Sequence, residues 1–232
     1  MAFSFLQNAQ DATLFQSSYT FSSQNLGTAA SDRQIIVLAK TEGVNGGGLV
    51  FSSITVQGIT ATLIQADTGA VTANNCAIAI VDVPTGTTGD IVVTLGVTTA
   101  YDMGIGVYRA TNTNLTAFHS ASHSPAAGTS PTASVSINVP STGFVIGVAG
   151  SRNDASISDM VWSGITTRDY FVAARSNAMH SGARGTPAEQ SGLTVSCAYT
   201  SSGSVAANML VASFQDIAAP VIYIPDLGLA FL

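Results

Sequence analysis

The chain has 232 residues, of which 46% are hydrophobic and only 9% are charged, and its formal net charge is −6. This length suits one large β domain or two small ones, and it is sufficient for a buried core without disulfides or metals. The low charge and the high hydrophobic content exclude a disordered chain. The seven basic residues form no basic stripe, and no apolar run is long enough to span a membrane, so we expect neither nucleic-acid binding nor a membrane span.

Residues 1–18 are a weakly patterned N-terminal segment. Phe3, Phe5, Leu14 and Phe15 are apolar, and no charged face accompanies them. Two interpretations remain open: the segment packs on its own domain, or it is an arm that docks on a neighbouring subunit.

The first half of the chain reads as a series of short strands with alternating apolar residues. Gly104 and Gly106 lie opposite the apolar face of the last of these strands, where another part of the molecule can approach closely. The expected strands cover residues 19–26, 33–40, 53–56, 60–65, 78–81, 91–95 and 103–107, with a hairpin turn at Gln57-Gly58.

The second half continues in the same way. The expected strands cover residues 134–139, 144–149, 157–162, 166–173, 193–199 and 208–214. Residues 110–131 and 176–190 are predicted to be long loops, and we interpret the first as a crossover within one domain. The sequence VPSTGFVIGVAG, from Val139, echoes VPTGTTGDIVVTLG, from Val83, but one hairpin is too short to establish a duplication.

Many short strands separated by turn signals, without a convincing helix, predict an all-β fold. With two long crossovers, a jelly-roll-like antiparallel β-sandwich is the favoured architecture. We expect a single sandwich domain over residues 19–216, with extended segments at 1–18 and 217–232.

Residues 217–232, IAAPVIYIPDLGLAFL, are apolar and carry a single charge, at Asp226. An exposed apolar segment is a liability unless something covers it. It is either a final strand packed on its own core or an assembly arm that adds to the sheet edge of another subunit. The side chains expected to make the arm contacts are Val221, Ile222, Tyr223, Ile224, Leu227, Leu229, Phe231 and Leu232.

Motifs for catalysis or cofactor binding are not apparent. PTGTTGD lacks the lysine of a phosphate-binding loop, and there is no G-x-S-x-G nucleophile elbow. His119 and His123 lie in a Ser- and Pro-rich stretch without a metal-binding pattern. Cys76 and Cys197 are expected to be buried apolar residues, although a disulfide between them stays open. We therefore expect no enzymatic activity, no cofactor and no metal.

Trp162 and Tyr170 are the candidates for a glycan-contact surface, because aromatic rings stack on sugars. The alternative for Trp162 is a core position, as is common for a lone tryptophan in a sandwich.

Several strand and turn motifs are similar in kind and order to β-sandwich structural proteins of tailed bacteriophages and prophages. They cover Tyr19–Phe21, Leu26–Val37, Ser53–Thr62, Val83–Val93 and Gly104–Tyr108. The resemblance implies a virion structural component, such as a head decoration, a spike or a tail-associated module. It would be assembled in the host bacterial cytoplasm as a homo-oligomer, with other virion proteins as partners and no catalytic role. The alternative is a carbohydrate-binding module that recognises a host surface glycan.

Overall fold

The computed structural model describes residues 3–43, 49–65, 74–96, 100–152, 157–175 and 178–217, and every regular element in these ranges is a β-strand. This confirms the predicted all-β class. The first half contains β1 (Phe3–Asp11), β2 (Ser18–Asn25), β3 (Arg33–Gly43), β4 (Phe51–Val56), β5 (Ile59–Thr60), β6 (Thr62–Gln65), β7 (Asn74–Asp82), β8 (Thr88–Leu95) and β9 (Ala100–Thr111). The second half contains β10 (His119–His123), β11 (Gly128–Thr129), β12 (Thr132–Val139), β13 (Gly143–Arg152), β14 (Ile157–Ser163), β15 (Thr167–Arg175), β16 (Ala178–Gly185), β17 (Gln190–Ser201) and β18 (Ser204–Gln215).

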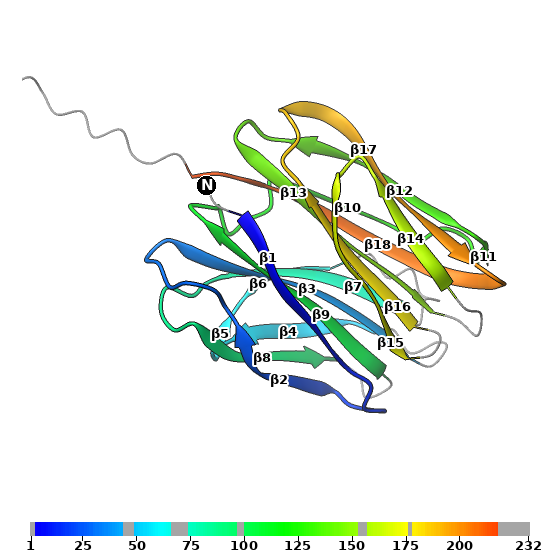
Figure 1. Ribbon diagram of the computed structural model, residues 1–232, viewed down its shortest axis with the longest axis horizontal. Coiled ribbons are helices and arrows are strands. Elements are labelled where there is room, and N and C mark those ends of the chain that lie inside the picture. Colours follow the sequence, from blue (N-terminus) through cyan, green and yellow to red (C-terminus); the bar gives the residue numbers. More distant parts are fainter. Residues whose placement is uncertain are drawn as a thin grey trace, which may run out of the picture.

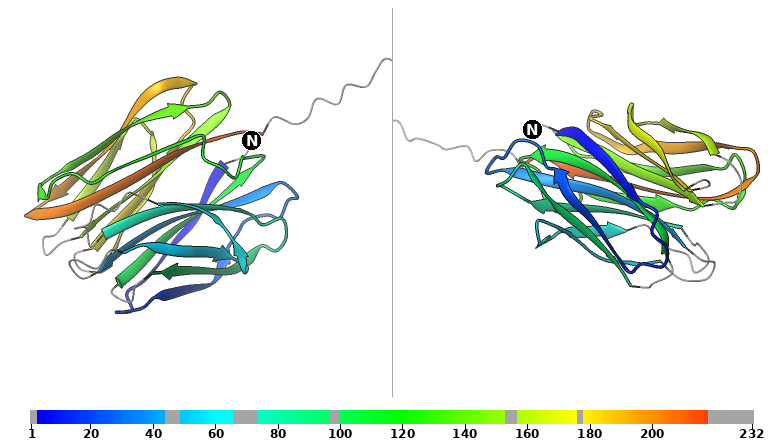
Figure 2. Two further views of the ribbon diagram at one scale, coloured as in Figure 1. Left: turned by 180° about the vertical axis from the view of Figure 1, so that it is seen from behind. Right: turned by 60° about the horizontal axis from the view of Figure 1, so that its bottom comes forward.

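The strands form four sheets, which are arranged as two sandwiches side by side (Figures 1 and 2). In the first sandwich, an inner sheet of order β1-β9-β3-β7-β6 faces an outer sheet of order β2-β8-β4-β5. In the second, an inner sheet of order β10-β18-β13-β16-β15 faces an outer sheet of order β12-β17-β14, and β11 also pairs with β18. The two inner sheets pack against each other, so the described part of the chain has four layers and three apolar interfaces between them.

The position of each sheet explains the sequence pattern of its strands. On β12, in an outer sheet, exposed and buried residues alternate strictly, because only one face of the strand is covered. On β3, in an inner sheet, every residue is buried because both faces are covered. The continuous run RQIIVLAK is therefore the signature of an inner strand.

The second sandwich repeats the strand order of the first. The inner order β1-β9-β3-β7 corresponds to β10-β18-β13-β16, and the outer order β2-β8-β4 corresponds to β12-β17-β14. The two similar sequences, from Val83 and from Val139, do not occupy equivalent positions in this repeat. The first lies in the connection between β7 and β8, and the second lies in the connection between β12 and β13. The connection equivalent to β12–β13 in the first sandwich is β2–β3. The two sandwiches therefore share their strand order, but the similarity between these two sequences does not result from it.

The interface between the two inner sheets is apolar and rich in aromatic rings. Phe3 of β1 stacks on Phe144 of β13 with a centroid distance of 4.0 Å, and Phe144 stacks on Phe214 of β18 at 5.3 Å. Phe5 packs in the same cluster. Residues 3–11 thus form an edge strand that packs on their own chain, which is the first of the two interpretations of the N-terminal segment.

Two stretches that the sequence predicts as long loops contain strands, and these predictions are wrong. β10 lies within residues 110–131, and β16 lies within residues 176–190. β16 has the sequence AMHSGARG, which has little intrinsic β propensity. It is held as a strand because it pairs with β13 on one side and β15 on the other.

The stretch 19–216, predicted to be a single domain, forms two sandwiches joined by this interface, and β1, which precedes it in the chain, is part of the first sandwich. Whether they unfold as one unit stays a prediction. Along the described ranges, the structure contains no helix that is long and apolar enough to cross a membrane.

Candidate functional site

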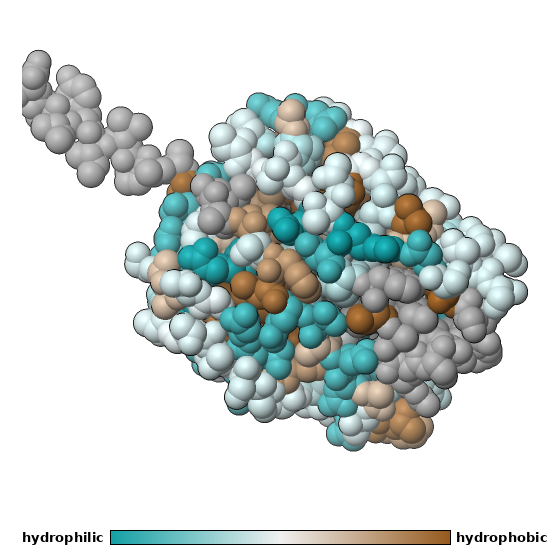
Figure 3. All heavy atoms as spheres, viewed as in Figure 1, coloured by the Kyte–Doolittle hydropathy of each residue, from teal (hydrophilic) through white to brown (hydrophobic). Residues whose placement is uncertain are grey.

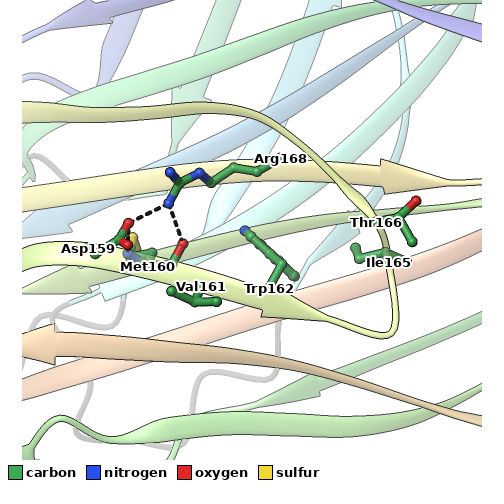
Figure 4. Close-up of a pocket in the computed structure, with 7 residues that line it drawn as sticks. All are labelled: Asp159, Met160, Val161, Trp162, Ile165, Thr166 and Arg168. Carbon is green, nitrogen blue, oxygen red and sulfur yellow. Dashed lines mark hydrogen bonds and ion pairs between the residues drawn. The ribbon is translucent and has the colours of Figure 1, made fainter.

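A pocket of about 310 Å³ lies where β14 meets β15, at the edge of the second outer sheet (Figure 4). The residues that line it are Asp159, Met160, Val161, Trp162, Ile165, Thr166 and Arg168. They come from β14, the turn after it and the start of β15. This turn passes through Gly164, whose φ of +83° is a left-handed conformation that favours glycine.

The polar wall of the pocket is an ion pair between Asp159 and Arg168, whose side chains are 42% and 41% exposed. Arg168 also donates to the backbone carbonyl of Met160 at 2.8 Å, and Asp159 accepts from the Met160 backbone N–H at 2.9 Å. The hydrogen bond from Arg168 lowers the pKa of the Asp159 carboxyl. The pair thus caps backbone groups at an edge strand, which is one way in which proteins protect exposed sheet edges.

The aromatic wall is Trp162, which is half-buried. Its indole N–H donates to the Ser181 hydroxyl at 3.0 Å, and its ring lies against Gly147, where an added Cβ would be 2.8 Å from the ring. The residue also packs against the core of the second sandwich. Most of the Trp162 side chain therefore packs against the core, and only part of the ring faces the pocket.

Tyr170, which the sequence analysis paired with Trp162 as a glycan contact, does not line this pocket. It is 7% exposed and packs between the two sandwiches, with a centroid distance of 5.7 Å to Phe5. Burial raises the pKa of its hydroxyl far above the ordinary value. This corrects the prediction for Tyr170: a ring enclosed between two sheets has no surface for a sugar.

A second pocket of about 140 Å³ adjoins the first, since both are lined by Ile165 and Thr166. The lining of the larger pocket offers an aromatic edge, an exposed ion pair and the Thr166 hydroxyl. These groups can hydrogen-bond and stack on a polyhydroxylated ligand. The larger pocket has a single carboxyl, Asp159, among its described residues, whereas glycoside hydrolysis ordinarily uses two.

Sequence reasoning did not identify Asp159, Thr166 and Arg168 as members of one site. The sequence did contain one local indication of this site. Asp159 and Arg168 lie on two consecutive predicted strands joined by a short turn, and a short turn brings such residues together. The sequence did not show that β15 would leave the outer sheet and pair with β16 in the inner sheet.

His119 and His123 of β10 have a structural role. The Nδ1 atom of His119 accepts from the backbone N–H of Asn138 at 2.8 Å, and that of His123 accepts from Ser134 at 3.0 Å. The two imidazoles thus pair backbone groups along the edge of β12.

Cys76 and Cys197 are both buried and free, as expected for small apolar residues. Cys76 lies in the interface between the sandwiches, and Cys197 lies in the core of the second sandwich. The structure contains no disulfide between them.

The predicted arm residues, Val221 to Leu232, lie outside the described residues. The chain is described as far as Ile217, whose backbone N–H donates to Asn112 at 2.6 Å and which is 54% exposed. Phe118, which pairs through its backbone with Ser213 near the end of β18, is 52% exposed. The segment 217–232 thus begins with an exposed apolar side chain, Ile217.

Comparisons with models of known protein families, with curated protein sequences and with solved structures found no match to this chain. The resemblance to structural proteins of tailed bacteriophages therefore stays a prediction.

Proposed function

We propose that this protein is a structural subunit of a tailed-phage virion, which acts through contacts between subunits and not through catalysis. The observation that carries the proposal is the surface of the outer sheets. The exposed side chains of β12 are Thr132, Ser134, Ser136 and Asn138, and none of them is charged. Ordinary soluble proteins have a far more charged surface. Faces of small neutral residues lose little solvation energy when neighbouring subunits cover them.

Figure 3 shows the hydropathy of one face of the molecule. Pale shades of intermediate hydropathy cover much of it, and strongly hydrophilic residues gather across its middle beside several hydrophobic ones. Only 9% of all residues are charged, which is well below the roughly 25% of typical soluble domains.

The strand order supports the proposal at the level of the fold. We infer that each sandwich is a jelly roll, because the first and last strands of each half, β1 with β9 and β10 with β18, are neighbours in an inner sheet. Jelly rolls occur in viral capsid proteins and in lectins. Because one fold can have many functions, this is an argument by analogy.

We further propose that residues 217–232 are the assembly arm. They follow β18, which ends near the N-terminus of the described chain in all three views (Figures 1 and 2). Fifteen residues follow Ile217, and an extended chain of this length spans roughly 50 Å. That is enough to reach a neighbouring subunit and to add a strand to one of its sheet edges.

Mass photometry of the full-length protein and of a variant that ends at Asp216 tests this function. The proposal predicts assemblies for the full-length chain and monomers for the shortened chain. If both are folded monomers, and the full-length protein binds no other virion protein, the structural function is rejected.

A host-glycan receptor module is the second candidate, and the pocket lined by Trp162 and Arg168 is the observation that favours it. Binding to a glycan array that is abolished by Arg168→Ala and retained by Thr20→Ala, a change at an exposed residue on the outer sheet of the first sandwich, would support it. The absence of binding to every host surface glycan tested would exclude it.

A further inference from the structure

Three ionisable side chains are enclosed near one end of the interface between the sandwiches. Lys40 and Glu42 are on β3, and Asp102 is on the neighbouring strand β9, where it is directly opposite Glu42. Lys40 and Asp102 are completely buried, and Glu42 is 7% exposed. Lys40 is also the only lysine of the chain. A charge that is normally on the surface is thus in the interior.

The geometry brings these groups close, and no described residue forms a hydrogen bond with the amine. Lys40 Nζ lies 3.7 Å from Asp102 Oδ1 and 4.0 Å from Glu42 Oε2. Among the described residues, neither Nζ nor Asp102 Oδ2 has a hydrogen-bond partner, although Asp102 Oδ1 accepts from the Glu42 backbone N–H at 3.0 Å. A buried ion pair is costly unless further hydrogen bonds complete it, and these atoms lack such bonds.

The lysine is held in place by its surroundings. Its aliphatic stem packs on Gly150 of β13, where a Cβ atom would overlap Lys40 Cγ. The stem therefore lies directly against the second sandwich. The amine is fixed beside a carboxyl group in an environment from which the solvent is largely excluded, and such confinement raises the effective concentration of the reacting groups.

We propose that Lys40 and Asp102 are joined by an intramolecular amide bond that forms after folding, with Glu42 as the group that transfers protons. In the reaction, a proton first passes from the ammonium to a carboxylate, which gives a neutral amine and a neutral acid. The Nζ lone pair then attacks Cγ of Asp102, and an N–C bond forms. The C–OH bond breaks, and the hydroxyl leaves as water after it receives a proton.

Glu42 connects the two proton transfers. Its carboxylate takes a proton from the attacking nitrogen, and the resulting acid returns a proton to the departing hydroxyl, so Glu42 ends as it began. The overall change is one amine and one carboxylic acid to one amide and one water. No oxidant, metal or other reactant is required.

The neighbouring amides are less suitable partners for Lys40. Asn74 donates its side-chain N–H to the Gly150 carbonyl at 3.1 Å, and Asn208 donates its own to Ser124 at 3.0 Å. Reaction with either asparagine would release ammonia in place of water. The mass of the product therefore identifies the partner.

The amide would tie β3 to β9 close to the ends of both strands. It replaces a buried cation and a buried anion by one neutral group. This inference does not depend on the proposed virion function, because it concerns a reaction within a single chain.

The test uses purified full-length protein that is denatured, digested with trypsin and analysed by mass spectrometry. Trypsin cuts after Arg33, Lys40 and Arg109 in an unmodified chain and gives separate peptides 34–40 and 41–109. The proposal predicts one peptide, 34–109, that is lighter by one water and has no cut after Lys40. An amine-reactive label on the denatured protein should then find no lysine amine.

Variants assign the roles. Asp102→Ala and Glu42→Gln should restore the cut after Lys40 and the labelling of its amine, whereas Asp159→Asn, a change at the distant pocket, should leave the link intact. Wild-type protein with its unmodified mass and a labelled Lys40 overturns the proposal without any variant. A product that is lighter by one ammonia would show that Asp102 is not the partner of Lys40. Complete formation of the link in Glu42→Gln would show that Glu42 does not transfer the protons.

Discussion

The ring of Tyr170, on β15, lies directly on the α-carbon of Gly106, on β9. A Cβ atom at Gly106 would overlap Tyr170 Cε1, and one at Gly182 of β16 would overlap the same atom. The two glycines belong to the two inner sheets, so the tyrosine fills a space that exists only because both lack side chains. This contact sets how closely the sandwiches approach.

Gly106→Ala should therefore destabilise the protein through steric overlap in the interface. We expect a loss of about 1–3 kcal/mol in the free energy of unfolding, which is typical of overpacking a filled core. Urea denaturation measures it. Gly128→Ala is the matched control, since a Cβ there meets only a backbone oxygen at 4.0 Å. Equal stability of the two variants would show that Tyr170 moves aside without cost.

The buried cysteines report whether the two sandwiches unfold together. Burial raises the pKa of Cys76 and of Cys197 to about 12, so neither is a reactive thiolate in the native protein near pH 8. We expect Cys76→Ala and Cys197→Ala, each with one remaining thiol, to react with a thiol reagent only through unfolding, and at similar rates. Much faster reaction of Cys197 would mean that the second sandwich opens by itself.

The Asp159 carboxyl should titrate below the ordinary aspartate pKa of about 3.9, mainly because Arg168 donates a hydrogen bond to it. A lowered folded-state pKa means that the pair stabilises the protein above the unfolded pKa and loses this contribution as the pH falls through the folded value. Arg168→Ala should raise the pKa, as measured by NMR titration. Because both side chains are substantially exposed, the stability near pH 7 should change by less than about 1 kcal/mol. An unchanged Asp159 pKa in the variant would contradict the assigned cause.

Trp162→Ala tests whether the tryptophan is primarily a core residue. Its contacts with Gly147 and Ser181 predict a loss of about 3 kcal/mol or more in unfolding free energy, as for other truncations of large core side chains. Val161→Ala, at the adjacent residue, which is 52% exposed, should have little effect. A variant of Trp162 with wild-type stability would instead make it a binding residue.

The sequence was sufficient to predict the strands whose apolar residues alternate or run continuously. β12 and β3 are examples, because the pattern of each follows directly from the faces that are covered. It also indicated, through Gly104 and Gly106, that something would approach β9 closely. For Gly106 the approaching group is Tyr170.

The features that the sequence did not predict depend on tertiary contacts. β10 and β16 are made of small and polar residues, so their strand conformation comes from pairing with β18 and β13. The arrangement of two sandwiches was hidden because the interface draws residues from both halves of the chain. For the same reason, the burial of Tyr170 and the meeting of Lys40 with Asp102 were not visible in local patterns.

The central claim, that this protein works as an assembling structural subunit, is tested most directly by the mass of the particles that it forms in solution. Mass photometry should compare the wild type with a variant of equal length in which Val221, Ile222, Tyr223 and Ile224 are replaced by serine. We predict assemblies for the wild type and folded monomers for the variant, since only the apolar contacts of the arm are removed. Monomers in both cases, or identical assemblies in both, would contradict the role of the arm.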